Sequence, residues 1–204
     1  MTSQSVIIFI SNALDAYYSS HSFGTVAKDP PFEPQSGGAP PEMWNSQPDT
    51  DGWVEWKMLP STVSERDLEQ LEAEFEVKLP AILASYFRAR FHLFDQVAIG
   101  DLVLILPSVP SDSPFRPIRA NFLAWRQLMA ACFLPFGSFQ DGWGPLCFDL
   151  KEGSADDAPI CWFDHEHLAP LSKAELGDRA TLEPLKQPLF GSFRELLSRL
   201  RSTV

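Results

Sequence analysis

Three short apolar runs follow one another in residues 132–164, CFLPFGSFQDGWGPLCFDLKEGSADDAPICWFD. They cover 132–136, 145–150 and 159–164, and turns rich in glycine and aspartate separate them. Runs of this length between such turns are typical of neighbouring strands. A further run at 101–106, DLVLIL, is continuously apolar after its first residue, which predicts a buried strand.

Helical patterns lie on both sides of these runs. Ser64 and Asp67 approximate a capping box ahead of an apolar stripe, so a helix is predicted to begin there. Pro80 is expected to end that helix and to open the next one. Near the C-terminus, Ser192 and Glu195 form a second capping box ahead of another apolar stripe.

The order of the elements indicates an α+β protein. Weaker helical patterns at 7–17 and 119–131 precede the group of strands, and one helix follows it. We predict a single domain whose mixed, mainly antiparallel sheet is packed with helices. Within it, residues 1–28 contain an N-terminal helix, 29–50 form a Pro/Gly-rich extended arm and 51–204 form the core.

Composition excludes several classes of function. The chain has 204 residues, 45% of them apolar, and 16 basic residues against 27 acidic ones give a net charge of −11. That charge disfavours binding to nucleic acid or to an anionic membrane surface. No apolar run reaches the ~20 residues that span a bilayer, and no signal peptide is evident. We expect a cytoplasmic protein whose three cysteines are reduced core residues.

The acidic residues are concentrated in two segments. Residues 49–78 hold nine acids and three bases, and residues 141–166 hold seven acids and one base, a net charge of −6 in each. The two segments could face one partner if the fold brings them together. Within the second, Asp156 and Asp157 are expected in a solvated hairpin loop, since the ligand spacing of a calcium site is missing.

No strong catalytic motif is present. Phosphate-binding loops, the zinc-protease helix and the nucleophile elbow are all missing. In an extended D-H-E-H segment (164–167), His165 and His167 would share a face and could hold a divalent metal, although no third ligand is indicated. Asp164 or Glu166 could instead act in acid–base catalysis, or the segment could be the turn after a strand. We expect no catalytic residues, metal or cofactor.

The tryptophans are more informative. Trp53 and Trp56 lie in DGWVEWK, and one of them is expected to fill the core beside the first acidic helix. Trp143 lies in the turn D-G-W-G, where burial is harder. Aromatic residues bordered by acids are typical of a protein-binding surface, so an exposed anchor and a core residue both remain open interpretations of Trp143.

The order of these features resembles the SUKH superfamily. From about Trp53 to Leu200 the chain carries EWKMLP, LEQLE, KLPAILASYF, LPFG, DGWG, PLCFD, PICWFDHE and SFRELL in turn. The superfamily includes fungal Smi–Knr regulators, many bacterial immunity proteins, and Syd, which associates with a translocon subunit. The N-terminal helix and the Pro-rich arm are more similar to Syd, so that branch stays open.

The resemblance implies a non-catalytic immunity protein that neutralises a cognate toxin, often a nuclease or another contact-delivered effector. A basic toxin domain would be steered to an acidic surface. We expect the partner to contact a tryptophan and acidic residues: Asp141, Trp143, Asp156, Asp157, Asp164, Glu166, Asp49, Asp51 and Glu55.

Two alternatives remain. The first is a Syd-like scaffold that binds basic translocon loops or another house-keeping partner. The second is a metal-dependent enzyme that uses the D-H-E-H segment.

Overall fold

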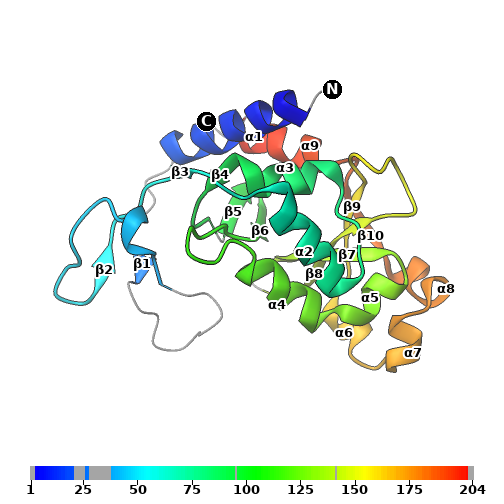
Figure 1. Ribbon diagram of the computed structural model, residues 1–204. Helices are drawn as coiled ribbons and strands as arrows, with labels where there is room; N and C mark the ends of the chain where they lie inside the picture. Colours follow the sequence, from blue (N-terminus) through cyan, green and yellow to red (C-terminus); the bar gives the residue numbers. More distant parts are fainter. Residues whose placement is uncertain (1–2, 21–25, 28–37, 95, 141, 202–204) are drawn as a thin grey trace.

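The computed structural model describes residues 3–20, 26–27, 38–94, 96–140 and 142–201 (Figure 1). They form a single α+β domain in which helices pack on a six-stranded, curled half-barrel sheet. Residues 29–37 of the predicted arm at 29–50 lie outside the described residues. None of the helices described is long and apolar enough to span a membrane.

The sheet is a meander in which each strand pairs with its neighbours in the chain. Its strands are β5 (Gln96–Ile99), β6 (Leu102–Ile105), β7 (Phe133–Phe139), β8 (Gly144–Asp149), β9 (Ile160–Trp162) and β10 (Gln187–Phe190). The three strands expected within 132–164 are confirmed as β7, β8 and β9, and the run at 101–106 contains β6. Every pairing in this sheet is antiparallel, so the prediction of a mainly antiparallel sheet holds but the prediction that it is mixed was wrong.

Strands β7 to β9 are buried on both faces, which explains their continuous apolar sequence. Leu146 and Phe148 of β8 point into the main core, whereas Cys147 and Asp149 alternate to the other face. A smaller second core, to which Cys147 and Cys161 belong, covers that face. All three cysteines are free, and Cys132 is only partly buried.

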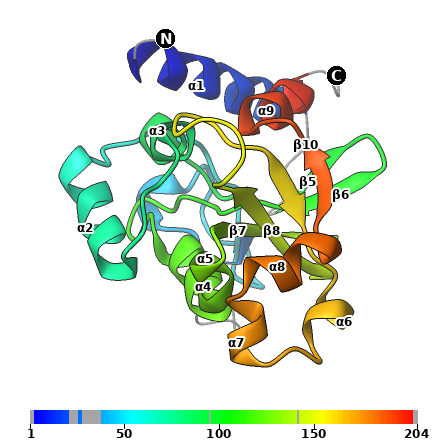
Figure 2. The same cartoon turned by 90° about the vertical axis from the view of Figure 1, so that its right-hand side faces the viewer.

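Helices cover both faces of the sheet (Figure 2). The helices are α1 (Ser3–Ser20), α2 (Glu65–Phe75), α3 (Ala81–Ala89), α4 (Arg116–Ala124), α5 (Arg126–Ala130), α6 (His165–Leu168), α7 (Lys173–Leu176), α8 (Arg179–Leu182) and α9 (Phe193–Arg201). Apolar residues of α1 to α4 and α9 belong to the main core, and those of α5, α6 and α8 to the second core. The helix expected at 119–131 is therefore two helices, which meet at Trp125.

Short segments complete the fold. They are 3₁₀ helices at Pro41–Met43 and Glu183–Leu185 and four two-residue strands, β1 (Val26–Ala27), β2 (Trp53–Val54), β3 (Leu59–Pro60) and β4 (Arg90–Phe91). Strand β1 pairs with β2, and β3 with β4.

The predicted helix starts are confirmed, with differences in detail. At α2, the Asp67 N–H donates to Ser64 Oγ (3.3 Å) and the Ser64 N–H donates to Asp67 Oδ2 (2.8 Å). This helix ends at Phe75, where Glu76 is left-handed (φ 55°), and not at Pro80, which directly precedes α3. At α9, the Glu195 N–H donates to Ser192 Oγ (3.0 Å) as predicted, whereas the carboxylate of Glu195 accepts from Gly191 N–H (2.8 Å) in place of Ser192 N–H.

The N-terminal helix contacts the edge strand β5 of the sheet. Its predicted stripe is buried at Ile10, Leu14 and Tyr17. The backbone N–H of Ala98, in edge strand β5, donates to the hydroxyl of Tyr17 (3.1 Å). A strand edge that is paired in this way cannot recruit another chain at that position.

One histidine is enclosed in the main core. His92 is 0% exposed, its Nδ1 accepts from Phe94 N–H (3.3 Å), and its Nε2 has no hydrogen-bond partner among the described residues. Its ring meets that of Tyr86 edge to face, with 5.2 Å between the centroids. Burial lowers the pKa of His92 from 6.5 to about 3, because an imidazolium would lose its hydration there.

We predict that mild acid destabilises the fold through His92. Below about pH 6.5 His92 is protonated in the unfolded chain but stays neutral in the native state, so the free energy of unfolding falls as the pH drops towards 3. The loss between pH 7 and pH 5 should be about 2 kcal/mol. Urea unfolding at both pH values measures it. A His92→Gln variant should lose most of this pH dependence, and an equal dependence in the two proteins would contradict the prediction.

Candidate functional site

The predicted partner-binding residues lie on three different elements. Trp143, Asp164 and Glu166 lie around the turn before β8 and the start of α6. Asp156 and Asp157 lie in the loop between β8 and β9. Asp49, Asp51 and Glu55 lie in the hairpin around β2, which Figure 1 shows well apart from α6. Asp141 lies outside the described residues.

Trp143 is an exposed aromatic residue on a fixed turn. Its side chain is 54% exposed, and its N–H donates to the carbonyls of Phe139 and Gln140, both at 2.9 Å. Its own carbonyl accepts from the backbone N–H of His165 and lies 2.8 Å from Nδ1 of the same residue. Four contacts therefore hold the backbone of Trp143, while its ring faces solvent.

Gly144 allows this turn to lie against the next segment of chain. A Cβ at this position would lie 1.7 Å from the carbonyl oxygen of Phe163, which no side chain can tolerate. The glycine after the tryptophan is thus required by close backbone packing, and it brings Trp143 beside the D-H-E-H segment.

The D-H-E-H segment is the first turn of helix α6 and not an extended strand. Asp164 caps this helix by accepting from Glu166 N–H (2.9 Å), which agrees with the interpretation of a turn after a strand. Nδ1 of His165 contacts the Trp143 carbonyl oxygen. The segment is not among the groups of three or more potential metal ligands in the described residues. The first turn of α6 contacts the backbone of Trp143 through His165, so Asp164 and Glu166 lie in a segment that adjoins an exposed tryptophan.

The loop between β8 and β9 caps two helices. Backbone N–H groups of Ala81 and Ile82 at the start of α3 donate to the carbonyls of Ala155 (3.2 Å) and Asp156 (2.9 Å). The carboxylate of Asp157 accepts from the first N–H groups of α9, those of Phe193 (2.8 Å) and Arg194 (3.2 Å).

Only one aspartate of this pair is solvated. Asp156 is exposed as expected, whereas Asp157 is half-buried, and the expectation of a solvated Asp157 was wrong. Burial raises the pKa of the Asp157 carboxyl group, although its two amide contacts oppose the rise. Asp157 therefore has a structural role whatever its part in binding, and its replacement would uncap α9.

The hairpin around β2 presents a second exposed tryptophan. Trp53 is 44% exposed, whereas Trp56 is only 4% exposed and fills the core, as one of the pair was expected to do. Asp49 accepts from the N–H groups of Asp51 (2.9 Å) and Trp53 (2.8 Å), so its carboxylate shapes the turn. Asp51 and Glu55 are exposed beside it.

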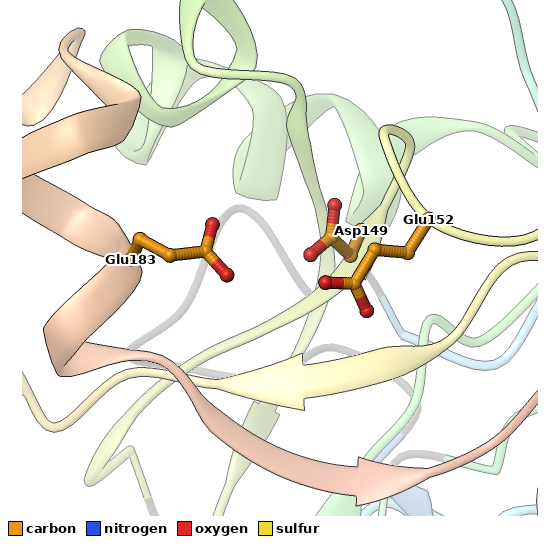
Figure 3. Close-up of side chains that lie close together, drawn as sticks. All are labelled: Asp149, Glu152 and Glu183. Carbon is orange, nitrogen blue, oxygen red and sulfur yellow. The ribbon is translucent and has the colours of Figure 1, made fainter.

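A cluster of charged side chains that the sequence did not indicate lies on the outer face of the sheet. Figure 3 shows the carboxylates of Asp149, Glu152 and Glu183 turned towards a common space. One oxygen of each lies within 4.8 Å of the others. Nζ of Lys186 occupies that space, at 2.9, 2.8 and 2.6 Å from the three carboxylates. Arg179 adds two contacts of 2.8 Å to Asp149.

The cluster is a salt-bridge network and not a vacant metal site. Asp149 is 1% exposed, and burial alone would raise its pKa. The hydrogen bonds from Arg179 and Lys186 outweigh that effect and hold the pKa below its ordinary value. Lys186 is desolvated as well, yet its three carboxylates raise its pKa. The ammonium group thus supplies the positive charge that a metal ion would otherwise bring.

Comparisons with known proteins add no assignment. No protein-family model and no curated protein matches the chain.

We predict that Lys186→Met unfolds more easily than the parent protein by roughly 3 kcal/mol, because it leaves buried Asp149 short of one cation. Methionine keeps the apolar stem and removes only the charge. Chemical denaturation measures the difference. Lys173→Met, at an exposed position of α7, is the matched control and should change little. Equal stability of the two variants would contradict a structural role for the network.

The parent protein and Lys186→Met also test whether the cluster can bind a metal ion. Millimolar Ca²⁺ should leave the Tm of the parent protein unchanged, because Lys186 already neutralises the three carboxylates. In Lys186→Met the oxygens are released and suit a hard cation, so Ca²⁺ should raise Tm. A rise in the parent protein would show that the ammonium does not exclude metal.

Proposed function

We propose that this protein is a non-catalytic immunity protein of the SUKH type, which binds and neutralises a cognate toxin through an acidic surface that bears exposed aromatic residues. The observation that carries the proposal is the patch formed by Trp143, Asp164 and Glu166.

The physical properties of this patch suit protein binding. An aromatic ring contributes a large apolar area, and Trp143 has a backbone fixed by its contacts with the preceding turn and with His165. A fixed anchor loses little conformational entropy when a partner covers it. Carboxylates around it, in a chain of net charge −11, would attract a basic partner over a distance and speed association.

The fold supports the same proposal. The resemblance implies a single α+β domain with helices packed on a sheet, and the described residues have that architecture. The function is nevertheless argued from the patch, because one fold can host many activities.

Co-expression with toxin candidates tests the function. Each protein encoded beside this gene in its native genome would be produced in a bacterial host, with and without this chain. Restored growth and a purified complex are expected with one of them. Failure to protect against any toxic neighbour would overturn the proposal. A growth defect in native cells that lack only this gene would favour the Syd-like scaffold.

We predict that Trp143→Ala weakens the complex by about 2 kcal/mol, roughly thirtyfold in Kd, because an exposed aromatic anchor is lost. Titration calorimetry with the protective partner measures this change. Leu123→Ala is the matched control, since Leu123 is 63% exposed on α4, away from the patch. An equal, small effect of the two substitutions would remove Trp143 from the interface.

A further inference from the structure

A groove of about 570 Å³ lies on another face of the domain. Helices α2 and α3 line it together with the loop between β8 and β9, and these elements can be followed in Figure 2. Ala81, Ala84 and Ser85 of α3 line it at helical spacing. Side chains this small leave a hollow above the helix, and Val6 of α1 and Arg194 of α9 border it.

The two acidic segments of the chain meet at this groove. Glu65, Glu69 and Glu72 project from α2 at spacings of four and three residues, so they follow one face of the helix. Asp156 and Asp157 contribute from the loop between β8 and β9. The groove thus has acidic side chains from two elements that are distant in the sequence.

Three of these five carboxylates are already engaged. Glu65 lies 3.3 Å from Nη1 of Arg88, Glu72 pairs with Lys78, and Asp157 caps α9.

Glu69 and Asp156 are different. Both are exposed, and within the part of the chain that the structure describes neither side chain has an ion pair or a hydrogen bond. They come from α2 and from the loop, on either side of the small residues of α3. The charge of Glu69 acts on Lys78, but Lys78 hydrogen-bonds to Glu72. Among the described residues that line the groove, five carboxylates outnumber the three basic side chains of Lys78, Arg88 and Arg194, so the groove keeps a net negative charge.

We propose that this groove receives a basic peptide segment of the partner protein. Its apolar atoms would lie on the small side chains of α3, and its Lys or Arg side chains would reach Glu69 and Asp156. Charge complementarity selects this occupant, since an anionic segment would meet uncompensated carboxylates. The inference rests on the proposed function and extends it, because it assigns a second contact surface remote in sequence from Trp143.

A defined probe tests the groove without knowledge of the partner. The probe is a fluorescein-labelled helical peptide built from the repeat Lys-Ala-Ala-Ala-Lys, titrated at low salt with the full chain. The test variant is the double substitution Glu69→Lys, Asp156→Lys. Binding should weaken roughly tenfold or more, because both free carboxylates become repulsive. Neither side chain has a structural contact, so Tm should stay close to that of the parent protein.

The control reverses two acids outside the groove, Glu76→Lys and Asp101→Lys. Each pair changes the net charge from −11 to −7, because every substitution adds two charges. A general charge effect would weaken peptide binding equally in the two variants, and that result would overturn the proposal. Amide chemical shifts place the peptide directly. Shifts at Ala84, Ser85 and Asp156 support the groove, and shifts confined to other surfaces overturn it.

Two further outcomes are informative. Full displacement of the peptide by spermidine with the same amide shifts would make the occupant a small polycation and overturn the peptide proposal. Peptide binding in the groove by a chain that protects against no toxin would uphold the groove and reject the immunity function. If the parent protein binds no peptide in the groove and the Glu69→Lys, Asp156→Lys variant still protects against the toxin, the groove proposal fails and the immunity function stands.

Discussion

Asp149 is the last residue of strand β8, and its side chain on the outer face of the sheet is closed to solvent. Its charge draws the chain that carries α8 onto this face. A buried carboxylate is costly unless cations pair with it. Arg179 of α8 and Lys186, which directly precedes β10, supply these cations. The Cζ atom of the Arg179 guanidinium also lies 4.4 Å from the centroid of the Phe133 ring. The ion pairs thus fix the chain between β9 and β10 onto a face that Cys147 and its apolar neighbours have already made hydrophobic.

Local signals were sufficient for the parts of the fold that short stretches determine. The caps at Ser64 and Ser192 and the strands within 132–164 depend on residues close together in sequence, so the sequence predicts them. Strand β10 has four residues and includes a proline, and α6 to α8 have four residues each, too few to show a period. The pairing of Asp149 with Arg179 joins positions 30 apart, and nothing in the spacing indicates it.

The candidate site divides in the same way. The sequence predicts the glycine-flanked turn but leaves the burial of Trp143 open, and the position of Trp143 beside Asp164 depends on Gly144 packing against Phe163. Composition also cannot separate acids that support the backbone from acids that are free. Asp49 and Asp157 are both engaged with backbone amides, although in sequence they look like any other surface carboxylate. The acidity available to a partner is therefore smaller and more localised than the formal charge indicates.

The loop between β8 and β9 holds helix α3 by the carbonyl oxygens of residues 155 and 156 and holds α9 by the side chain of Asp157. Every amino acid has a carbonyl, so position 156 can mutate without loosening α3, whereas position 157 needs an acceptor side chain. Over evolutionary time the groove could therefore change its chemistry at 156 while the neighbouring position stays fixed. Such a division separates the surface chemistry of this loop from the stability of the two helices that it caps.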